Sequence, residues 1–566
     1  MKKLLLFFFL IPFFQAKAQQ EDAWIYLKDK PNKTTFLNNP LTMLSQRALD
    51  RRAKLNISLD SIDVPVDNSY YNQIKNTPNI TVLAKSKWLN AIHILAEVGV
   101  INNLTSTFSF IDHIEFANKS LPTNVNLKSK YKVTTSNHLN KLNQTITSFN
   151  YGDADNQIKM LKGNYLHEQG FTGKGQVIAV IDGGFANVNT LAAFQRIRDN
   201  NQILGGYDFV NKSDDFYRII TNTEGKIINN HGTNVLSTIG AYIENTFVGT
   251  APDASFYLFV TEDVTREVPL EESLWVAAAE KADSLGVDVI NTSLGYTTFD
   301  NSNYNYTYQD MDGKTTFISR GAEIGASRGL LLVNAAGNSG NSDWKYIGAP
   351  ADAPSVISVG AVNALEEIAA FSSFGPTSDG RIKPEILAQG RNVIAINHNT
   401  NLTYTTNGTS FSSPIIAGLV ACLNQIEHPL LKSLNLPDHN LNQLLKQAIY
   451  QSADNFSSPT AQYGYGIPDF ENAYNAYTSS LATIDDTLKP DFTIFPNPAK
   501  NFIEISSDTF ILNDSTIQIF TILGKQLLEK LYLSTKKLDV SFLKSGIYIL
   551  KISYKNQQKT LKLVIE

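Results

Sequence analysis

Asp182, His231 and Ser410 are residue types that together can turn a hydroxyl into a nucleophile. A serine hydroxyl reacts poorly at neutral pH, so it needs a neighbouring base, which in turn needs a carboxylate to orient it. Asp182 lies in the segment VIDGG, His231 opens HGTNV, and Ser410 lies in GTSFSSP. Because histidine titrates near neutral pH, His231 could take the serine proton and later return it. These residues predict hydrolysis through a covalent intermediate.

The order of the three residues along the chain narrows this prediction. Asp, then His, then Ser differs from the order in α/β-hydrolases and from the order in the chymotrypsin type. Asn338, in the segment AAGN between His231 and Ser410, supplies an amide that could donate to an oxyanion. On these four segments the chain resembles the subtilisin-like serine proteases, or subtilases.

The resemblance implies a catalytic role for each of the four residues. His231 would take the Ser410 proton as the hydroxyl attacks a peptide carbonyl, and would then protonate the leaving amine. Asp182 would hold the imidazole in the required tautomer. Asn338 would donate its side-chain amide to the oxyanion, together with the backbone N–H of Ser410.

Substrate-binding positions also follow from the resemblance. Ser293, Leu294 and Gly295 match the subtilase strand that pairs with the substrate backbone and forms a wall of the S1 pocket. Gly348 matches the floor of that pocket. Because glycine has no side chain, we expect the pocket to accept a large apolar or aromatic residue.

Three positions depart from the subtilase pattern. Gly183 replaces the Thr or Ser that commonly follows the catalytic aspartate, and Asn234 stands where many members have a second histidine. Leu191 falls where many bacterial members place an aspartate ligand for a structural calcium ion. Calcium binds several oxygen ligands, so calcium at that position is not expected. Calcium at other positions stays open, and no cofactor is required by the predicted chemistry.

Composition excludes several other functions. The 566 residues carry a net charge of −5 and form no long basic cluster, so nucleic acid is not an expected partner. The single cysteine, Cys422, excludes an intrachain disulfide and lies in an apolar run that predicts a buried thiol. The histidines show no metal-ligand spacing, and we interpret His167 and His398 as surface or hydrogen-bonded structural residues.

The first 18 residues have the pattern of an export signal. Lys2 and Lys3 precede the apolar stretch Leu4–Phe14, and Ala16-Lys17-Ala18 forms a small-x-small cleavage site. A bilayer-spanning helix takes about 20 apolar residues, so this stretch is too short, and no transmembrane anchor is expected elsewhere. We therefore expect an exported protein, secreted or on the cell surface.

Residues 19–145 predict a small α+β module before the catalytic residues. Short strand-like runs at 24–27, 80–83 and 91–95 alternate with a charged helical pattern at 44–54. The resemblance implies a propeptide that assists folding and inhibits the enzyme until it is cleaved, and a substrate-recruiting domain is the alternative. Residues 127–150 are polar and would suit an exposed, cleavable linker.

Residues 146–480 predict an α/β fold, a subtilisin-like parallel sheet with helices on both faces. Continuous apolar runs such as 176–181, 287–291 and 330–334 alternate with helical patterns. Catalytic and binding residues then follow strand ends, where ligands bind in such sheets. An apolar run at 415–423 places Ser410 near a helix N-terminus, with Pro414 in the first turn of that helix.

After a linker at 481–491, residues 492–566 predict a small C-terminal β-sandwich. Alternating apolar and polar residues, as in KTLKLVI at 559–565, are separated by glycine turns such as LGK at 523–525. The module resembles the type A sorting domain that Bacteroidetes attach to cargo of the type IX secretion system. That secretion machinery is therefore an expected partner, and an accessory module binding carbohydrate or protein is the alternative.

The leading hypothesis is a secreted serine endopeptidase that is made as a zymogen and acts on proteins or peptides. The alternative is a catalytically inactive, peptide-binding relative, although all three triad residues are present. An α/β-hydrolase esterase would need Gly-x-Ser-x-Gly, whereas position 412 is serine. The natural substrate, the oligomeric state, and release against surface attachment stay open.

Overall fold

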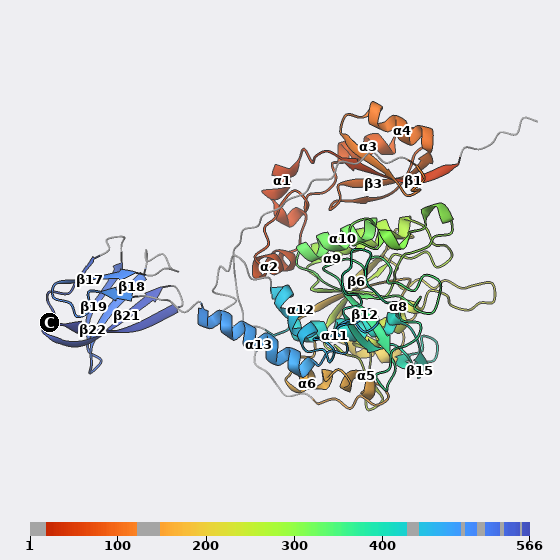
Figure 1. Cartoon of the computed structure of the whole chain (residues 1–566). Helices are drawn as coiled ribbons and strands as arrows, with labels where there is room; N and C mark the ends of the chain where they lie inside the picture. Colours follow the sequence, from red (N-terminus) through yellow and green to blue (C-terminus); the bar gives the residue numbers. More distant parts are fainter. Residues whose placement is uncertain are drawn as a thin grey trace, which may run out of the picture. The chain divides into compact units, whose positions relative to one another are not determined.

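The computed structural model describes residues 19–121, 148–426, 441–487, 493–506, 515–532, 537–554 and 557–566. The export signal and most of the expected cleavable linker lie outside these residues. The chain forms two compact units, and among described residues the boundary falls between Tyr474 and Asn475 (Figure 1). None of the described helices is both long and apolar enough to cross a bilayer.

A seven-stranded parallel sheet forms the centre of the first unit, in the order β13-β12-β11-β10-β5-β9-β6. All residues of β5 and β11 are buried, as expected for a parallel sheet that is covered on both faces. The predicted fold class is confirmed. The strands are β5 (Val177–Asp182), β6 (Ile203–Asp208), β9 (Ser255–Val260), β10 (Val289–Thr292), β11 (Leu331–Ala335), β12 (Ile357–Val362) and β13 (Ile386–Gln389).

Helices cover both faces of this sheet. On one face α9 (Leu270–Leu285) and α10 (Phe317–Ser327) pack side by side, and on the other α8 (His231–Gly240) packs against α11 (Thr409–Asn424) (Figure 1). The core beneath α9 and α10 includes alternate residues of β5, because successive side chains of a strand point to opposite faces. Smaller elements complete the unit: α5 (Asp155–Lys159), α6 (Gly163–Glu168), α7 (Gln195–Asp199), α12 (Leu441–Gln451), β7 (Tyr242–Ile243), β8 (Phe247–Val248), β14 (Val393–Ile396) and β15 (Thr403–Thr406).

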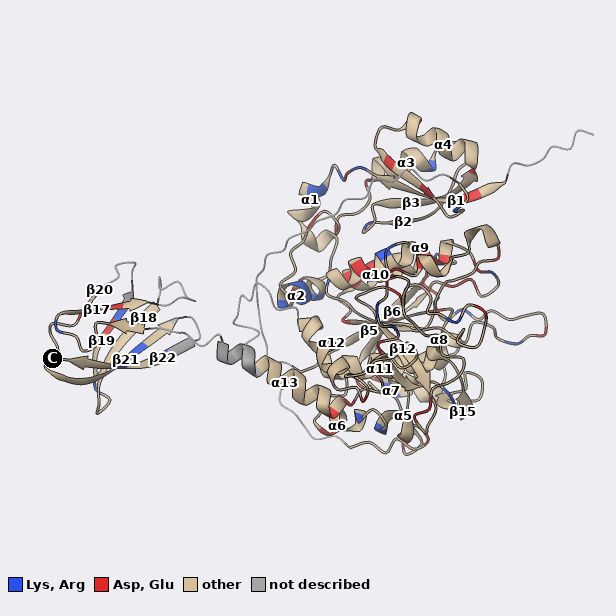
Figure 2. Cartoon of the chain, viewed as in Figure 1, with Lys and Arg blue, Asp and Glu red and all other residues tan. Residues whose placement is uncertain are grey.

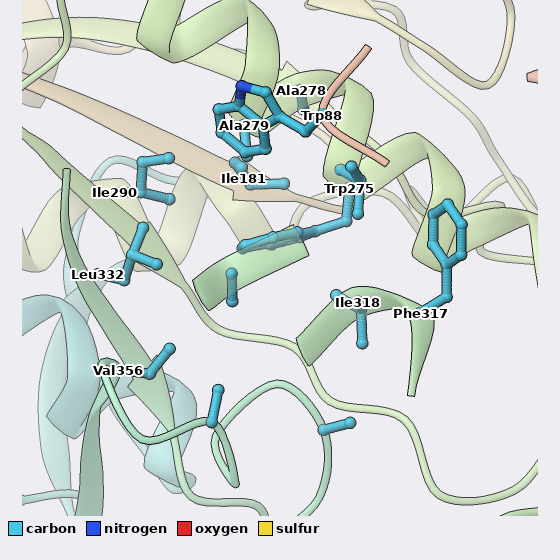
Figure 3. Close-up of a cluster of buried hydrophobic side chains, with 14 of the residues drawn as sticks. Trp88, Ile181, Trp275, Ala278, Ala279, Ile290, Phe317, Ile318, Leu332 and Val356 are labelled. Carbon is cyan, nitrogen blue, oxygen red and sulfur yellow. The ribbon is translucent and has the colours of Figure 1, made fainter. Parts of the chain in front are cut away.

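The N-terminal module is an antiparallel sheet in the order β2-β3-β1-β4, with α3 (Asn68–Lys75) and α4 (Val98–Thr107). The three strand-like runs in the sequence belong to β1 (Gln20–Leu27), β2 (Thr81–Ser86) and β3 (Ala91–Glu97), which β4 (Ile111–Phe116) completes. The module also contacts the catalytic region: Trp88 lies beside Ala278 and Ala279 of α9 in one continuous core (Figure 3).

Between β1 and α3 the chain makes an excursion that we call the arm, residues 28–67. The arm holds α1 (Lys33–Leu37), a short 3-10 turn and α2 (Gln46–Lys54), the helix expected from the charged pattern at 44–54. Ser45 caps α2 by accepting a hydrogen bond from the Ala48 N–H. Basic residues line α2, and acidic residues lie on α9 of the catalytic region (Figure 2).

The C-terminal region forms two antiparallel sheets around its own apolar core, as the sequence predicts. Helix α13 (Phe470–Thr487) extends into the segment 481–491, so part of the expected linker is helical. The strands are β16 (Thr493–Phe495), β17 (Phe502–Ser506) and β20 (Lys537–Asp539) in one sheet, and β18 (Ser515–Thr521), β19 (Gln526–Tyr532), β21 (Gly546–Tyr554) and β22 (Gln557–Ile565) in the other.

Candidate active site

Asp182 and His231 are joined by a hydrogen bond of 2.7 Å between Oδ1 and Nδ1. Asp182 is the last residue of β5 and is fully buried, whereas the His231 side chain at the start of α8 is 40% exposed. A carboxylate only accepts, so His231 carries its proton on Nδ1 and leaves Nε2 free to act as a base. Of the two carboxylate oxygens of Asp182, Oδ1 also accepts from the Gly183 N–H at 2.7 Å, and Oδ2 has no partner among the described residues.

The pKa of His231 lies above its ordinary value. Burial alone would lower it, but the Asp182 carboxylate stabilises the imidazolium by more, and the Glu262 carboxylate adds to that effect. Because a base with a higher pKa accepts a proton more readily, this environment suits proton abstraction from a hydroxyl.

Ser410 is the second residue of α11 and is nearly buried, at 8% exposure. Gly408 caps this helix with φ of 141°, a backbone conformation that favours glycine. The ring of the next residue, Phe411, lies 6.1 Å from the His231 ring, so the start of α11 is beside this histidine. The Ser410 hydroxyl donates to the Ser293 carbonyl at 3.2 Å.

The position of Pro414 differs from the one expected. Because α11 begins at Thr409, Pro414 lies beyond the first turn, where a residue would normally donate its N–H to the carbonyl four positions earlier. Proline has no N–H, so the Ser410 carbonyl loses its helical partner. The Ser293 hydroxyl donates to this carbonyl at 2.8 Å and replaces the missing bond.

Asn338 lies just beyond β11, and its side-chain orientation is fixed by Thr409. The Asn338 Oδ1 accepts from the Thr409 N–H at 2.9 Å and from the Thr409 hydroxyl at 3.1 Å. With Oδ1 held in this way, the Nδ2 amide group is the free donor. A Cβ added to Gly408 would lie 3.6 Å from Nδ2, so this donor is next to the segment that carries Ser410. Sequence reasoning missed Thr409, whose role depends on this contact.

The segment that follows β10 carries the predicted substrate-binding residues. Ser293 is buried, Leu294 is partly buried and Gly295 is exposed, so the segment rises from the core to the surface. Tyr296 then pairs with Ala349 in an antiparallel bridge, with N–H to O distances of 2.8 and 3.2 Å. A Cβ added at Gly348 would lie 3.1 Å from Thr297 Cγ2, so Gly348 packs closely against the residues that follow the segment.

The sheet order explains why these residues meet. Strands β5, β10 and β11 are neighbours, and their carboxyl ends precede Gly183, Ser293 and Asn338 respectively. Parallel strands end at the same edge of a sheet, so residues more than 100 positions apart come together there. Two further helices supply His231 and Ser410 at their N-terminal ends.

Glu262 is a further residue of the site that sequence reasoning missed. It follows β9 and accepts hydrogen bonds at Oε1 from the Tyr296 hydroxyl at 2.6 Å and from the Thr261 hydroxyl at 2.8 Å. A Cβ added at Gly183 would lie 3.7 Å from Glu262 Cβ, so the Glu262 side chain lies beside the residue that follows Asp182. No sequence motif marks it, because its neighbours come from three separate strands.

The calcium position considered from the sequence does not fit a cation here. Leu191 is buried and offers no side-chain oxygen. Its carbonyl, and that of Val188, accept hydrogen bonds from Arg198 at 2.7 and 2.8 Å, so an arginine already supplies positive charge to this loop. Among the described residues, no group of three His, Cys, Asp or Glu side chains is placed to hold a metal ion.

His167 and Cys422 are structural, as expected. The His167 imidazole is buried between the Tyr151 hydroxyl and the Thr250 carbonyl, and burial lowers its pKa to about 4. The Cys422 thiol donates to the Thr250 carbonyl, and burial raises its pKa well above the usual range. His398 accepts from the Asn230 amide at 3.1 Å, so it too is hydrogen-bonded.

Helix α9 binds the N-terminal module through a buried carboxylate. Glu280 accepts from the Ser86 hydroxyl at 2.6 Å and from the backbone N–H groups of Lys87 and Trp88 at 3.1 and 2.9 Å. These donors end β2 and would otherwise lose their hydrogen bonds on burial. Through these hydrogen bonds, one acidic side chain of the catalytic region holds the end of strand β2 of the N-terminal module.

A second contact joins the arm to the same helix. Arg51 and Arg52 of α2 both donate to the buried carboxylate of Asp283, and Arg52 also pairs with Asp63 at 2.9 Å. The Arg52–Asp283 distance is 2.7 Å, and all four side chains are at least nine-tenths buried. Removing one partner of such a buried ion pair is strongly destabilising, because the other charge is left buried without a partner. The sequence pattern of α2 suggested only a charged helix.

One edge of the parallel sheet thus carries a carboxylate-bound histidine, a serine at the start of a helix and an oriented amide. Residues 173–466, more than half of the chain, match the subtilase family, and the chain belongs to that family. Residues 22–136 match the peptidase S8 propeptide domain of Bacteroidota, and residues 493–566 match a secretion system C-terminal sorting domain. The protein is therefore a serine-type endopeptidase with a propeptide and a type IX sorting domain, which implies export.

Curated relatives support the same family. Over 318 residues the chain is 30% identical to subtilisin DY of Bacillus licheniformis, a match covering 56% of this chain and 97% of the relative. Over 284 residues it is 32% identical to subtilisin E of Bacillus subtilis, covering 50% of this chain and 63% of that protein. A solved epidermin leader peptide processing serine protease from Staphylococcus aureus is 16% identical, with a TM-score of 0.49, over 81% of this chain and the whole of that chain.

Proposed function

We propose that the protein hydrolyses peptide bonds with Ser410 as nucleophile, His231 as general base and Asp182 as the orienting carboxylate. The observation that carries this proposal is the 2.7 Å bond from Asp182 to His231 Nδ1, which leaves Nε2 free next to the start of α11. Before attack, the Ser410 hydroxyl turns from the Ser293 carbonyl to His231 Nε2.

In the first half of the reaction, Ser410 Oγ attacks the peptide carbonyl and its proton passes to His231 Nε2. The carbonyl oxygen becomes an oxyanion, which accepts from Asn338 Nδ2 and from the Ser410 backbone N–H. The C–N bond then breaks as His231 returns the proton to the leaving amine, which gives an acyl-enzyme. In the second half, water attacks the acyl-enzyme carbonyl and gives a proton to His231. The bond to Ser410 Oγ then breaks, Ser410 takes that proton back, and the carboxylic acid product is released. The chemistry requires no cofactor.

The Ser293–Gly295 segment would bind the acyl side of the substrate, and Gly348 would admit a large side chain. An exposed backbone segment can pair with an extended peptide through main-chain hydrogen bonds. Gly295 is exposed and a Cβ there would meet only the Ala349 carbonyl, at 3.5 Å, so the approach to its backbone is open.

We further propose that the module at residues 19–145 keeps the enzyme inactive until it is removed. Its sheet and arm both bind α9, and the chain between described residues 121 and 148 would hold the cleavage site. The signal at residues 1–18 would direct export, and the C-terminal domain would then engage the type IX machinery, ending in release or surface attachment.

Intact mass tests the nucleophile and the zymogen together. Wild type and Ser410→Ala, each expressed without residues 1–18, are incubated at neutral pH and weighed by mass spectrometry. We expect wild type to lose an N-terminal fragment that ends between residues 121 and 148, while Ser410→Ala stays full length. If both stay full length and neither cleaves peptides, the inactive peptide-binding alternative replaces this proposal.

A further inference from the structure

Glu262 acts on the proposed catalytic base and contacts the residue that follows the proposed substrate-binding segment. On one side its carboxylate raises the pKa of His231, and on the other its Oε1 is held by Tyr296, the residue that directly follows Gly295. The Thr261 hydroxyl holds the same oxygen at 2.8 Å. The carboxylate is thus held in position by two hydroxyls, and Glu262 is partly exposed.

This carboxylate has no cation within the described part of the chain. The nearest basic residue along the sequence, Arg266, pairs with Asp263 at 2.6 Å instead. Asp182, Glu267 and Glu271 are the other charged groups whose fields act on Glu262, and all are acidic, whereas His231 is the one group nearby that can become cationic. A buried or half-buried carboxylate without a cation is costly, so a cationic ligand would relieve this cost.

An extended substrate brings one particular side chain to this place. Successive side chains of an extended peptide point in opposite directions. If the side chain of the residue that supplies the attacked carbonyl (P1) points toward Gly348, the side chain of the residue before it (P2) points the opposite way. The Glu262 side chain, which lies beside Gly183 and acts on His231, is the acidic group that we expect it to meet.

We propose that Glu262 selects substrates with lysine or arginine at P2. The inference rests on the proposed function, and it assigns the substrate class: proteins and peptides with a basic residue followed by a large apolar residue at the scissile bond. The ammonium or guanidinium group would donate to Glu262 Oε2, because Oε1 already accepts from the two hydroxyls.

The ionisation of Glu262 gives this selectivity a pH dependence. The pKa of Glu262 is raised to about 7: burial raises it most, the Tyr296 and Thr261 hydroxyls lower it, and the Glu267 and Asp182 carboxylates contribute a smaller rise. Below that pH the carboxyl is largely neutral and attracts a cation weakly. Preference for a basic P2 residue should therefore increase as the pH rises from 6 to 8.

The test compares peptide substrates that differ only at P2, with lysine, norleucine or glutamate before phenylalanine at P1. For wild type we expect kcat/KM for lysine to exceed that for norleucine about tenfold at pH 8, the effect of one hydrogen bond to a charged group, and glutamate to be the poorest. E262Q should bring the lysine-to-norleucine ratio close to one. Because the measured quantity is the ratio of two kcat/KM values, a general loss of activity in the variant does not change it.

Asp263→Asn is the matched control, because it removes a neighbouring negative charge that is already paired with Arg266. This variant should keep the wild-type ratio. Two results would overturn the inference: E262Q keeps the lysine preference, or an active wild type shows a ratio near one at every pH. Either result leaves the proposed function standing. Should E262Q not fold, the rise of the wild-type ratio between pH 6 and 8 still decides. Failure of wild type to cleave any of the peptides counts instead against the proposed function.

Discussion

Ser293 and Ser410 exchange hydrogen bonds: the Ser293 hydroxyl donates to the Ser410 carbonyl at 2.8 Å, and the Ser410 hydroxyl donates to the Ser293 carbonyl at 3.2 Å. The first bond compensates for Pro414, which cannot donate to that carbonyl. It ties the backbone of the proposed nucleophile to the proposed substrate-binding segment. The backbone N–H of Ser410, which we expect to donate to the oxyanion, belongs to the residue whose carbonyl this bond holds.

Ser293→Ala should therefore affect stability and turnover together. Without the hydroxyl, a buried carbonyl is left without a partner, at a cost of about 1–3 kcal/mol. We expect a lower Tm and a lower kcat, with KM for a peptide substrate changed less. Scanning calorimetry and steady-state kinetics on the processed enzyme measure both. Unchanged values for Ser293→Ala would show that the bond positions nothing.

Asn338→Ala should reduce kcat strongly. Loss of one oxyanion donor costs about 10²–10³ in kcat, a magnitude measured on a subtilisin rather than obtained from this structure. Thr409→Val removes the hydroxyl that holds Asn338 Oδ1 but keeps the Thr409 N–H bond at 2.9 Å. We expect a smaller loss of kcat for Thr409→Val, with KM nearly constant, because a partly released amide spends less time facing the oxyanion. Equal activity of Asn338→Ala and wild type would exclude Asn338 from the oxyanion site.

The acid limb of kcat/KM should lie above pH 6.5. His231 must be neutral to accept the serine proton, and its pKa is raised above the ordinary value by Asp182 and, to a lesser extent, by Glu262. Activity should therefore be lost as the pH falls through this raised value. E262Q removes one negative charge near His231, so its acid limb should move to lower pH. Profiles measured with a substrate neutral at P2 test this, and a shift to higher pH would contradict it.

Arg52→Met should weaken retention of the cleaved propeptide. The substitution removes the 2.9 Å partner of Asp63, which keeps Arg328 at 3.6 Å, and removes one of the two arginines that pair with Asp283. Breaking a buried pair costs about 3–5 kcal/mol, which corresponds to roughly 10²–10⁴ in dissociation constant. After autoprocessing, we expect the fragment to separate from the catalytic region on size exclusion, and activity to appear sooner.

Arg47→Met is the matched control for this prediction. Arg47 lies on the same helix α2 as Arg52 and pairs with Asp288. Its side chain is 41% exposed, so the pair contributes about 1 kcal/mol or less to stability. Arg47→Met should retain the fragment nearly as well as wild type. If Arg52→Met does the same, the arm has no part in holding the propeptide.

The sequence by itself determined the residue types of the site and the fold class. Buried strands such as β5 and β11 carry apolar runs, and Asp182 ends the first while Asn338 lies three residues beyond the second, a local pattern that can be recognised without the tertiary structure. The segments around Asp182, His231, Ser410 and Asn338 are likewise local. Pro414 shows the limit of such reasoning: the apolar run suggested a helix start after Ser410, whereas the helix begins at Thr409, because Gly408 provides the cap.

Only the tertiary structure decided which groups face one another. Thr409 orients Asn338 from 71 positions away, and Glu262 meets Tyr296 from 34 positions away. Arg52 meets Asp283 across 231 positions, and the sequence pattern showed no more than a charged helix at this arginine. The physical reason is that hydrogen bonds and charge interactions act over a few ångströms of space. Which groups meet depends on where the neighbouring strands and helices end in space, and the spacing of residues along the chain does not show this.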